Sequence, residues 1–379
     1  MIRTEKNKPP VFYLIDLHSI RIKREVTIHN RINNLVQLNN FRISMVDRLR
    51  FVKAYLQEGG LKGVSTEDLI RKIASVSSTH WHHLWRKRKR KCLRPRKEVE
   101  GWKVDSWTGM VRKAYGSSLS QVFERMDVNF QGTGSKNIKK TSRSSVKEIV
   151  LSPERKSQSL IVKEYKSINL LSRLKAVFRI SKARRAWINA HNLLMRGIST
   201  PVPVAFGEKK RWGIIRESFF ITEKIPEAEA SDFYLKELSG NLRDLKKEFL
   251  IRLARQIRWM HQTGICHGDL KASNILVTIL EEKPVIFLVD PDGVKIRNKL
   301  GVKEIAKDLS RLRAAFSGIL SQSEHEYFLA IYGRGNRFFQ DNEKKIMKKV
   351  RALTDKKIQQ KQKNKVSIHR KDAEDAKGR

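Results

Sequence analysis

The stretch HGDLKASN, residues 267–274, constrains the fold of this chain more than any other part of the sequence. It places a carboxylate, Asp269, and an amide, Asn274, on one loop, between an amphipathic helix predicted over residues 242–263 and a strand that ends in acids. Phosphoryl transfer requires this pair, because a carboxylate orients and deprotonates the attacking hydroxyl while an amide oxygen holds a metal ion. Lys271 can reach the transferred phosphate as a point charge. The alternative is that Asp269 only caps a turn.

Two further polar residues are placed in apolar strands, where such residues are uncommon. Lys163 lies inside LIVKEY, residues 160–165, and a lysine there is expected to bind the α- and β-phosphates of ATP. An edge strand, or a buried stem with its ammonium group in water, would also explain Lys163. Asp290 ends an apolar strand that begins at Pro284, and a carboxylate there suits Mg²⁺ that bridges nucleotide phosphates. Asp292 is a second candidate ligand.

The order of the expected elements indicates two lobes. Their composition predicts strands over residues 144–151, 157–166 and 218–225. A helix is predicted over residues 181–197, with a serine at its start as the cap and a glycine at its end. Strands followed by helices predict an α+β, bilobal fold, in which a small β-rich N-lobe precedes a helical C-lobe.

These motifs, in this order, resemble the protein-kinase-like superfamily and, within it, the lipopolysaccharide core kinases, small bacterial kinases that act on Kdo or heptose. The resemblance covers roughly residues 136–335. The segment GISTPVPVAFG, residues 197–207, favours this family over aminoglycoside and other small-molecule phosphotransferases, which share the H-G-D-x-x-x-x-N loop. The resemblance implies a kinase that uses ATP and Mg²⁺ and transfers phosphate to an alcohol group.

The resemblance also implies a role for each motif residue. The segment from Thr222 to Ile225 would be the hinge beside adenine, and Asp308 would brace the catalytic loop. The expected phosphate loop lacks glycines, so hydroxyls and backbone amides of the turn TSRSS, residues 141–145, would cradle phosphate instead. The implied site consists of catalytic Asp269 and Lys271; nucleotide-binding Lys163, Ser144, Ser145, Glu223 and Ile225; and metal-binding Asn274 and Asp290.

Two positions depart from the pattern of protein kinases. Ala186 lies on the inward stripe of its helix, where this fold usually offers a glutamate to the ATP-binding lysine. Either Ala186 is a small packing residue and Lys163 is held mainly by Asp290 and nucleotide, or the site is impaired. Gly268 stands where regulated protein kinases have an arginine that binds the phosphorylated activation loop. Activation by such phosphorylation is therefore not expected, which fits a constitutive metabolite kinase.

The start of the chain repeats its end. KPPVFYLIDLHSIRI, residues 8–22, aligns with EKPVIFLVDPDGVKI, residues 282–296, at a constant offset of 274. Matched leucines continue the alignment, and after a three-residue slip it reaches Tyr55 and Tyr332. Such internal similarity indicates one structural unit used twice, although two basic amphipathic stretches can also resemble each other by chance. We expect the first copy to be a C-lobe-like piece without catalytic residues.

The chain is strongly basic, with 80 Lys and Arg against 39 Asp and Glu and a formal charge of +41. Such a field attracts polyanions. The densest run, residues 79–97, combines Trp81 and Trp85 with nine basic residues, which suits an anionic membrane surface. Nucleic-acid binding and a solvated linker are the alternatives. A pure nucleic-acid-binding protein is disfavoured, because it leaves the order of the kinase-like motifs unexplained.

Cysteine content and hydropathy bear on the compartment. The two cysteines have unrelated surroundings, which argues against a disulfide framework and fits a reducing compartment. No apolar run approaches the roughly 20 residues of a membrane span, and the N-terminus lacks the apolar core of a secretory signal. We expect a cytoplasmic protein. The resemblance implies a peripheral location at the inner face of the cytoplasmic membrane, where a lipid carries the sugar acceptor.

The sequence therefore predicts an ATP-dependent kinase that phosphorylates a sugar hydroxyl of the lipopolysaccharide inner core or another anionic sugar. A catalytically impaired pseudokinase scaffold of the same fold and a RIO-like protein kinase are the alternatives. The accepting sugar and the oligomeric state stay open. The expected domains are a partial C-lobe-like repeat (1–60), a basic linker or extension (61–135), a kinase-like catalytic domain (136–340) and a basic, disordered tail (341–379).

Overall fold

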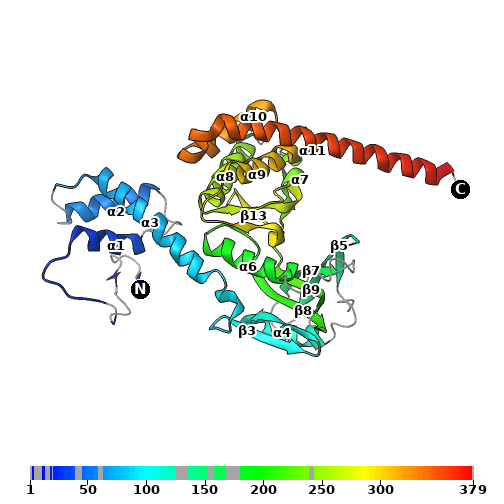
Figure 1. Cartoon of the computed structure of the whole chain (residues 1–379), viewed down its shortest axis with the longest axis horizontal. Helices are drawn as coiled ribbons and strands as arrows, with labels where there is room; N and C mark the ends of the chain where they lie inside the picture. The colour runs from blue at the N-terminus through cyan, green and yellow to red at the C-terminus, as the bar shows by residue number, and fades with distance from the viewer. Residues whose placement is uncertain are drawn as a thin grey trace. The chain divides into compact units, whose positions relative to one another are not determined.

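The computed structural model of the chain divides into two compact units, Met1–Trp81 and His82–Arg379, and each is described by itself. Figure 1 labels many of their helices and strands. The structure describes residues 2–3, 11–12, 18, 20–38, 45–58, 63–124, 135–142, 144–151, 158–166, 180–212, 214–238 and 243–377.

The first unit is a small helical assembly. Its buried apolar residues form one cluster, to which each of its described helices contributes. The elements are β1 (Ile2–Arg3), which pairs antiparallel with β2 (Val11–Phe12), then α1 (Ile28–Leu38), α2 (Met45–Gln57) and α3 (Thr66–Arg88), which continues into the second unit.

An antiparallel sheet of seven strands, in the order β3-β4-β8-β9-β7-β6-β5, forms the N-lobe of the second unit. α4 (Lys113–Glu124) and α6 (Lys182–Met195) pack on opposite faces of this sheet, because neighbouring β9 residues such as Phe219 and Phe220 point to opposite sides. The strands are β3 (Val99–Val104), β4 (Trp107–Arg112), β5 (Lys136–Lys140), β6 (Ser144–Leu151), β7 (Gln158–Lys166), β8 (Pro203–Arg211) and β9 (Ile214–Glu223).

The prediction of a linker over residues 61–135 is wrong for residues 99–124. Residues 99–112 form the β3–β4 hairpin, and β4 pairs with β8 from Trp107 to Val111. The hairpin covers an edge of β8 that would otherwise present unpaired backbone groups beside buried apolar residues. The N-lobe sheet is therefore larger than the sequence predicts.

Helix α6 begins and ends as predicted. The Ser181 hydroxyl accepts a hydrogen bond from the Arg184 N–H at 2.9 Å, which satisfies an amide at the helix start. Gly197 has a φ of 71°, a left-handed conformation that ends a helix at little cost for glycine. Local sequence signals alone fix these two ends.

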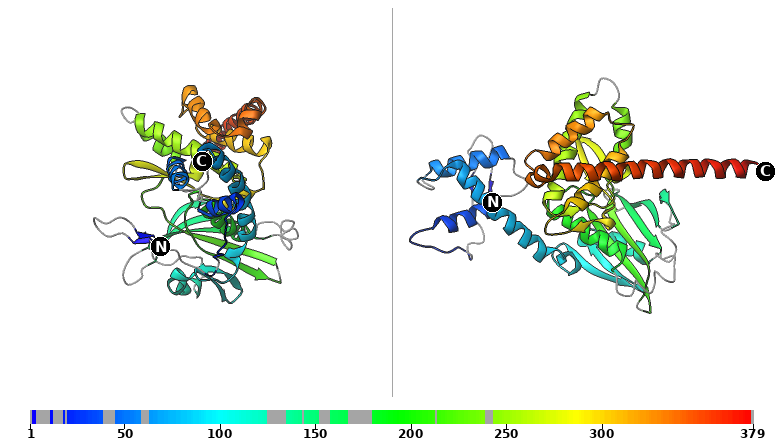
Figure 2. Two further views of the ribbon diagram at one scale, coloured as in Figure 1. Left: turned by 90° about the vertical axis from the view of Figure 1, so that its left-hand side faces the viewer. Right: turned by 45° about the horizontal axis from the view of Figure 1, so that its top comes forward.

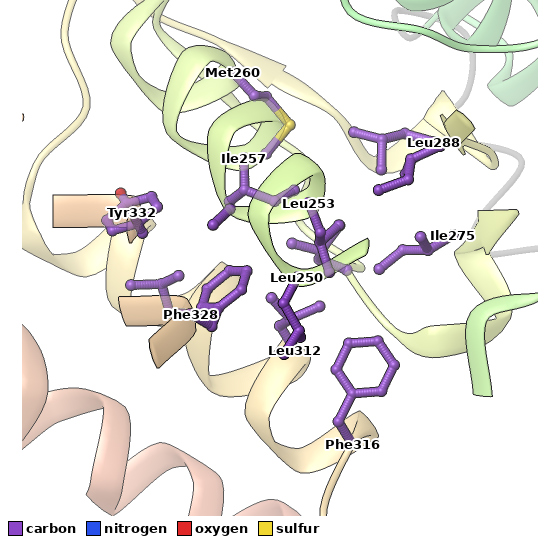
Figure 3. Close-up of a cluster of buried hydrophobic side chains, with 14 of the residues drawn as sticks. Leu250, Leu253, Ile257, Met260, Ile275, Leu288, Leu312, Phe316, Phe328 and Tyr332 are labelled. Carbon is purple, nitrogen blue, oxygen red and sulfur yellow. The ribbon is translucent and has the colours of Figure 1, made fainter. Parts of the chain in front are cut away.

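The C-lobe is helical and encloses one large apolar cluster. In Figure 3, Leu250, Leu253, Ile257 and Met260 of the long helix α8 lie at its centre, and Leu312 and Phe328 face them. The elements of this lobe are β10 (Glu229–Ala230), α7 (Ser231–Glu237), α8 (Arg243–Gln262), β11 (Ile265–Cys266), β12 (Ile275–Leu280), β13 (Lys283–Leu288), β14 (Lys295–Ile296), α9 (Val302–Ala315), α10 (Gln322–Gly333) and α11 (Arg337–Lys377).

The prediction of a disordered tail from residue 341 is wrong for at least its first part. Helix α11 is continuous through this stretch and projects beyond the C-lobe in Figure 2. Ile346, Val350 and Thr354 are buried, and the Thr354 hydroxyl lies 3.5 Å from the Ser310 carbonyl of α9. The polar composition concealed a narrow apolar stripe that packs on the lobe.

Helices of the first unit begin where the internal repeat predicts. α1 begins 274 residues before α9, and α2 begins 277 residues before α10, which reproduces the three-residue slip. Burial differs between the copies, because Leu38 and Phe51 are 61% and 48% exposed whereas their counterparts Leu312 and Phe328 are buried. Those counterparts pack in the cluster around α8, whereas Leu38 and Phe51 lie outside the buried cluster of the first unit.

Candidate active site

A cavity of about 630 Å³ lies between the N-lobe and the C-lobe of the second unit. Its walls come from β5, β6, β7 and β9 on one side and from the catalytic loop, β12 and the segment after β13 on the other. Seven of the predicted site residues line it: Ser144, Lys163, Glu223, Ile225, Lys271, Asn274 and Asp290.

Lys163 and Asp290 meet inside this cavity. The Lys163 ammonium donates a short hydrogen bond to the Asp290 carboxylate, although the two residues are 127 positions apart in the chain. Asp292 Oδ2 lies 3.9 Å from the same nitrogen. The Tyr165 ring centroid is 5.1 Å from it, which adds a cation–π contact. The fold therefore brings together the two residues that were assigned to the ATP phosphates and to metal.

Asp290 has a backbone φ of 63°, in the left-handed region. Aspartate is among the few non-glycine residues found there with any frequency, and such conformations gather at functional sites. The pKa of Asp292 is raised by burial and then by the negative charge of Asp290. Two carboxylates thus share one ammonium group at the cavity edge.

The catalytic loop is organised around Asp269. The Asn274 side-chain amide donates to the Asp269 carbonyl at 2.8 Å and to its Oδ2 at 3.1 Å. Lys271 Nζ lies 3.0 Å from Oδ2, and Arg311 Nε lies 3.8 Å from Oδ1. Burial would raise the pKa of Asp269, but Lys271, Arg311 and the Asn274 amide outweigh it and lower that pKa below its ordinary value.

Asp308 contacts the loop as the sequence predicts. Its carboxylate accepts from the backbone N–H of His267 at 2.7 Å and of Gly268 at 2.8 Å. His261 Nε2 lies 3.3 Å from the same carboxylate. Asp308 and His267 are fully buried, so these contacts are shielded from water and fix the loop in one position.

The geometry explains why residue 268 is glycine. Gly268 has a φ of 79°, and a Cβ built there would lie 2.8 Å from the Gly293 carbonyl oxygen. Any side chain would therefore strain the backbone and push against the segment that follows Asp290. Glycine is required by the fold at this position, whatever the regulation of the enzyme.

Ala186 is a small packing residue. It is fully buried on α6 among aromatic side chains that include Trp187. One turn later, α6 is hydrogen-bonded to the segment after Asp290. The Asn189 amide donates to the carbonyls of Pro291 at 2.8 Å and Val294 at 3.1 Å. Lys163 takes its carboxylate partners from the segment after β13 instead of from α6.

The hinge offers hydrogen-bonding groups and apolar walls to a flat ligand. The backbone N–H groups of Glu223 and Lys224 bond to the carbonyls of Val202 and Ser159. The Ile225 N–H has no hydrogen-bond acceptor among the described residues. The remaining apolar side chains of the cavity include Ile138, Val146, Ile161, Phe220, Leu276 and Val289.

The two serines assigned to the phosphate loop have different positions. Ser144 lines the cavity, and its N–H donates to the Thr141 hydroxyl at 3.1 Å in a tight turn. Ser145 points to the other face of β6, where its hydroxyl donates to Glu164. The assignment of Ser145 to nucleotide binding is therefore wrong, because successive residues of a strand face opposite sides. Arg143 of this turn lies outside the described residues.

Several residues of the site were not foreseen. Tyr115 donates to the Glu223 carboxylate at 2.8 Å and ties α4 to the hinge. Lys139 and Phe220 line the cavity, and Arg311 lies beside Asp269. Of these residues, only Arg311 could have been predicted from the sequence. It follows Asp308 by three residues and therefore lies on the same face of its helix.

The composition of the basic run, with Trp81 and Trp85 beside nine cations, predicts an interface with an anionic membrane. Trp85 is only 3% exposed, and the Arg196 guanidinium lies 4.7 Å from its ring centroid. The expectation of an interfacial anchor is therefore wrong for Trp85, which packs inside the second unit. The basic residues Arg86, Lys87, Arg88, Arg90, Arg94, Arg96 and Lys97 are exposed.

Comparison with known proteins bears on this arrangement. A model of the lipopolysaccharide kinase (Kdo/WaaP) family matches residues 133–332, more than half of the chain. The chain belongs to this family. The matched region contains the cavity lining from Ile138 to Pro291 together with Asp308 and Arg311.

Relatives in this family include enzymes with named substrates. The lipopolysaccharide core heptose(I) kinase WaaP of Escherichia coli is 31% identical over 157 residues, which cover 40% of this chain and 59% of that protein. A 3-deoxy-D-manno-octulosonic acid kinase of Haemophilus influenzae is 34% identical over 121 residues, 32% of this chain and 47% of that protein. This chain thus spans about half to three fifths of the length of the curated relatives it matches.

A solved structure described as WaaP in complex with acyl carrier protein also matches. It covers 65% of this chain and 98% of its own, with 17% identity and a TM-score of 0.49.

Proposed function

We propose that this protein is an ATP-dependent kinase that phosphorylates a sugar hydroxyl of the lipopolysaccharide inner core. The observation that carries the proposal is the convergence of Lys163, Asp290 and Asn274 on one cavity, with Asp269 beside it. Membership of the lipopolysaccharide kinase family supports the same reaction and favours a sugar acceptor.

In this mechanism the chain's own groups position two substrates. Lys163 holds the ATP phosphates, and the free Ile225 N–H donates a hydrogen bond to adenine. Asp269 orients the acceptor hydroxyl and takes its proton as the oxygen attacks the γ-phosphorus. Lys271, whose ammonium lies at the cavity edge, offsets negative charge on the transferred phosphoryl group.

The residues present suit Mg²⁺. It prefers oxygen ligands and usually keeps waters and phosphates beside one or two carboxylates, and among the described residues no cluster of three or more acid, histidine or cysteine ligands exists. Asp290 supplies a carboxylate. Asn274 donates through its nitrogen to Asp269, which leaves its side-chain oxygen for a metal. When bound, Mg²⁺ neutralises charge on the nucleotide phosphates.

Nucleotide binding tests this proposal directly. Mg-ATP at about 100 times its Kd should stabilise the wild type by about 2.7 kcal/mol, a Tm increase of several degrees. Lys163→Ala and Asp290→Ala should lose most of that increase, because each removes a phosphate or metal contact. Lys166→Ala, an exposed lysine on the same strand, is the matched control and should keep it. A wild type whose Tm does not respond to Mg-ATP would support a pseudokinase scaffold.

The acceptor is tested by transfer of labelled phosphate. Deacylated lipopolysaccharide core should be phosphorylated and a casein-like protein should not, because the family acts on sugars. The reverse result would favour a RIO-like protein kinase.

We also propose that the exposed basic residues from Arg86 to Lys97 bind the anionic inner face of the cytoplasmic membrane. None of the helices in the described residues has both the length and the apolar character that crossing a bilayer demands. The pKa of Lys91 is lowered by desolvation and by the charges of Arg96, Arg88 and Lys87, so the segment repels itself in the absence of an anion.

Vesicle sedimentation measures this contact. Changing Arg86, Lys87, Arg88 and Arg90 to glutamine should reduce binding to vesicles of anionic lipid by at least 100-fold, at roughly 1 kcal/mol for each basic residue. The same four-charge change at Lys344, Lys345, Lys348 and Lys349 of α11 is the control, and it should have a smaller effect. Equal losses in both variants would show that net charge alone governs binding. Retention on DNA-cellulose at high salt would instead favour nucleic acid.

A further inference from the structure

Two cations flank the catalytic carboxylate from opposite sides. Lys271 contacts Oδ2 of Asp269 at 3.0 Å, while Arg311 approaches Oδ1 through its Nε at 3.8 Å. The Arg311 contact is an ion pair, but it is too long for a hydrogen bond. Lys271 comes from the catalytic loop, whereas Arg311 comes from α9, three residues after Asp308.

Arg311 has unused hydrogen-bonding capacity. Its side chain is 21% exposed, and its Nη1, which is buried from solvent, has no hydrogen-bond acceptor among the described residues. A guanidinium carries five N–H donors in a planar fork that matches carboxylate or phosphate. The wide contact with Asp269 and the unpartnered Nη1 leave donors of that fork for another anion.

The position of Arg311 places it on the acceptor side. Asp269 and Arg311 do not line the cavity assigned to nucleotide, whereas Lys271 does. An attacking hydroxyl must reach Asp269 in line with the bond that breaks, on the side away from the leaving nucleotide. Arg311 therefore lies where the acceptor sugar arrives.

We propose that Arg311 binds an anionic group, a carboxylate or phosphate, that the acceptor sugar carries beside its reacting hydroxyl, and that this contact draws the guanidinium away from Asp269. The inference rests on the proposed kinase function and names the anionic group of the acceptor that Arg311 recognises. The released Oδ1 then accepts the hydroxyl proton. The hydroxyl oxygen bonds to the γ-phosphorus of ATP, and ADP leaves with the electrons of the broken phosphorus–oxygen bond.

The resting geometry agrees with this role. Asp269 Oδ2 is held by Lys271 Nζ at 3.0 Å and by the Asn274 amide at 3.1 Å, whereas Oδ1 has the wider Arg311 contact at 3.8 Å. An anion that draws Arg311 away therefore leaves Oδ1 open to the acceptor hydroxyl, while Lys271 and Asn274 keep the carboxylate in place.

The internal repeat supplies the test substitution. At the positions that match Asp308 and Arg311, the first copy has Asn34 and Gln37, so it keeps neither charge. Arg311→Gln removes the charge and keeps most of the side-chain volume. Arg313→Gln is the matched control, since Arg313 points to another face of α9 and bonds to Gln322 at 3.2 Å.

The experiment compares steady-state kinetics on a glycoside of 3-deoxy-D-manno-octulosonic acid, its methyl ester, and core oligosaccharide before and after phosphatase treatment. For Arg311→Gln we expect the KM of the anionic acceptor to rise about 10- to 100-fold, in the range of a hydrogen bond to a charged group. The KM of ATP should stay within about twofold. The wild type should show a similar loss on the neutralised acceptor, and Arg311→Gln should no longer distinguish the charged from the neutral form.

The pattern of results separates the possibilities. If Arg311→Gln no longer distinguishes the acid from its methyl ester, the recognised group is a carboxylate. If it no longer distinguishes the core oligosaccharide before and after phosphatase treatment, the recognised group is a phosphate. Either outcome supports the proposal. If Arg311→Gln still prefers the charged acceptor as strongly as the wild type and Arg313→Gln do, the role of Arg311 is overturned. Failure of the wild type to phosphorylate any of these sugars overturns the kinase function and this inference together. An unchanged Tm increase with Mg-ATP verifies that Arg311→Gln is folded.

Discussion

Replacement of Asp269 by asparagine is expected to lower kcat by about 10³-fold, within the range that a positioned general base contributes. The amide keeps the size of the side chain and can still contact Lys271, but it cannot take the proton of the attacking hydroxyl. Labelled-phosphate transfer to deacylated lipopolysaccharide core, measured with saturating Mg-ATP, checks this prediction.

Nucleotide binding should survive the same substitution, because Asp269 does not line the cavity. The Tm increase with Mg-ATP should therefore match that of the wild type. Asp244→Asn, at an exposed position in the first turn of α8, is the control for loss of one carboxylate and should retain full activity. Activity of Asp269→Asn within about tenfold of the wild type would rule out the assigned base.

The predictable part of the site depends on local patterns. Lys163 was recognisable because a lysine interrupts an apolar strand, and Asp290 because an acid ends one. The catalytic loop has its residues within eight positions, so its internal contacts follow from the motif itself. The contact of Asp308 with this loop spans 40 residues and was available only through resemblance to a kinase.

The unpredicted part depends on pairings between distant segments. The Tyr115–Glu223 hydrogen bond joins residues 108 positions apart, and β4 pairs with β8 almost a hundred residues later. Neither strand of the β3–β4 hairpin is distinctive by itself, since its alternation is short and follows a highly charged run. Trp85 looked like a surface aromatic for the same reason, whereas Arg196, supplied by a distant helix end, covers its ring.

With alanine at position 186, α6 is attached to the rest of the site through Asn189. Asn189 binds the backbone of the segment after Asp290, while Asp292 approaches Lys163 from that same segment. Helix α6, Lys163 and the segment that we propose to bind metal are thus linked without a helix glutamate.

Replacement of Asp308 by alanine is expected to have the largest effect on stability. Two backbone N–H groups, of His267 and Gly268, would lose their acceptor in a fully buried site, and each unsatisfied buried donor costs about 1–3 kcal/mol. We expect the free energy of unfolding to fall by about 3 kcal/mol, and phosphate transfer to fall with it because the loop that carries Asp269 loses its support. Urea unfolding and labelled-phosphate transfer measure the two effects.

Asp308→Asn, the residue that the first copy has at Asn34, separates charge from hydrogen bonding. It keeps one acceptor oxygen and should be less destabilising than alanine. Burial would raise the pKa of Asp308, but His261, His267 and the Gly268 N–H outweigh it and lower that pKa. The stabilisation from its charge is therefore present above the pKa of an unfolded aspartate and lost as pH falls through the lower folded value. Wild type should lose this contribution in acid while Asp308→Asn does not; parallel pH profiles of the two proteins would show that the charge of Asp308 does not support the loop.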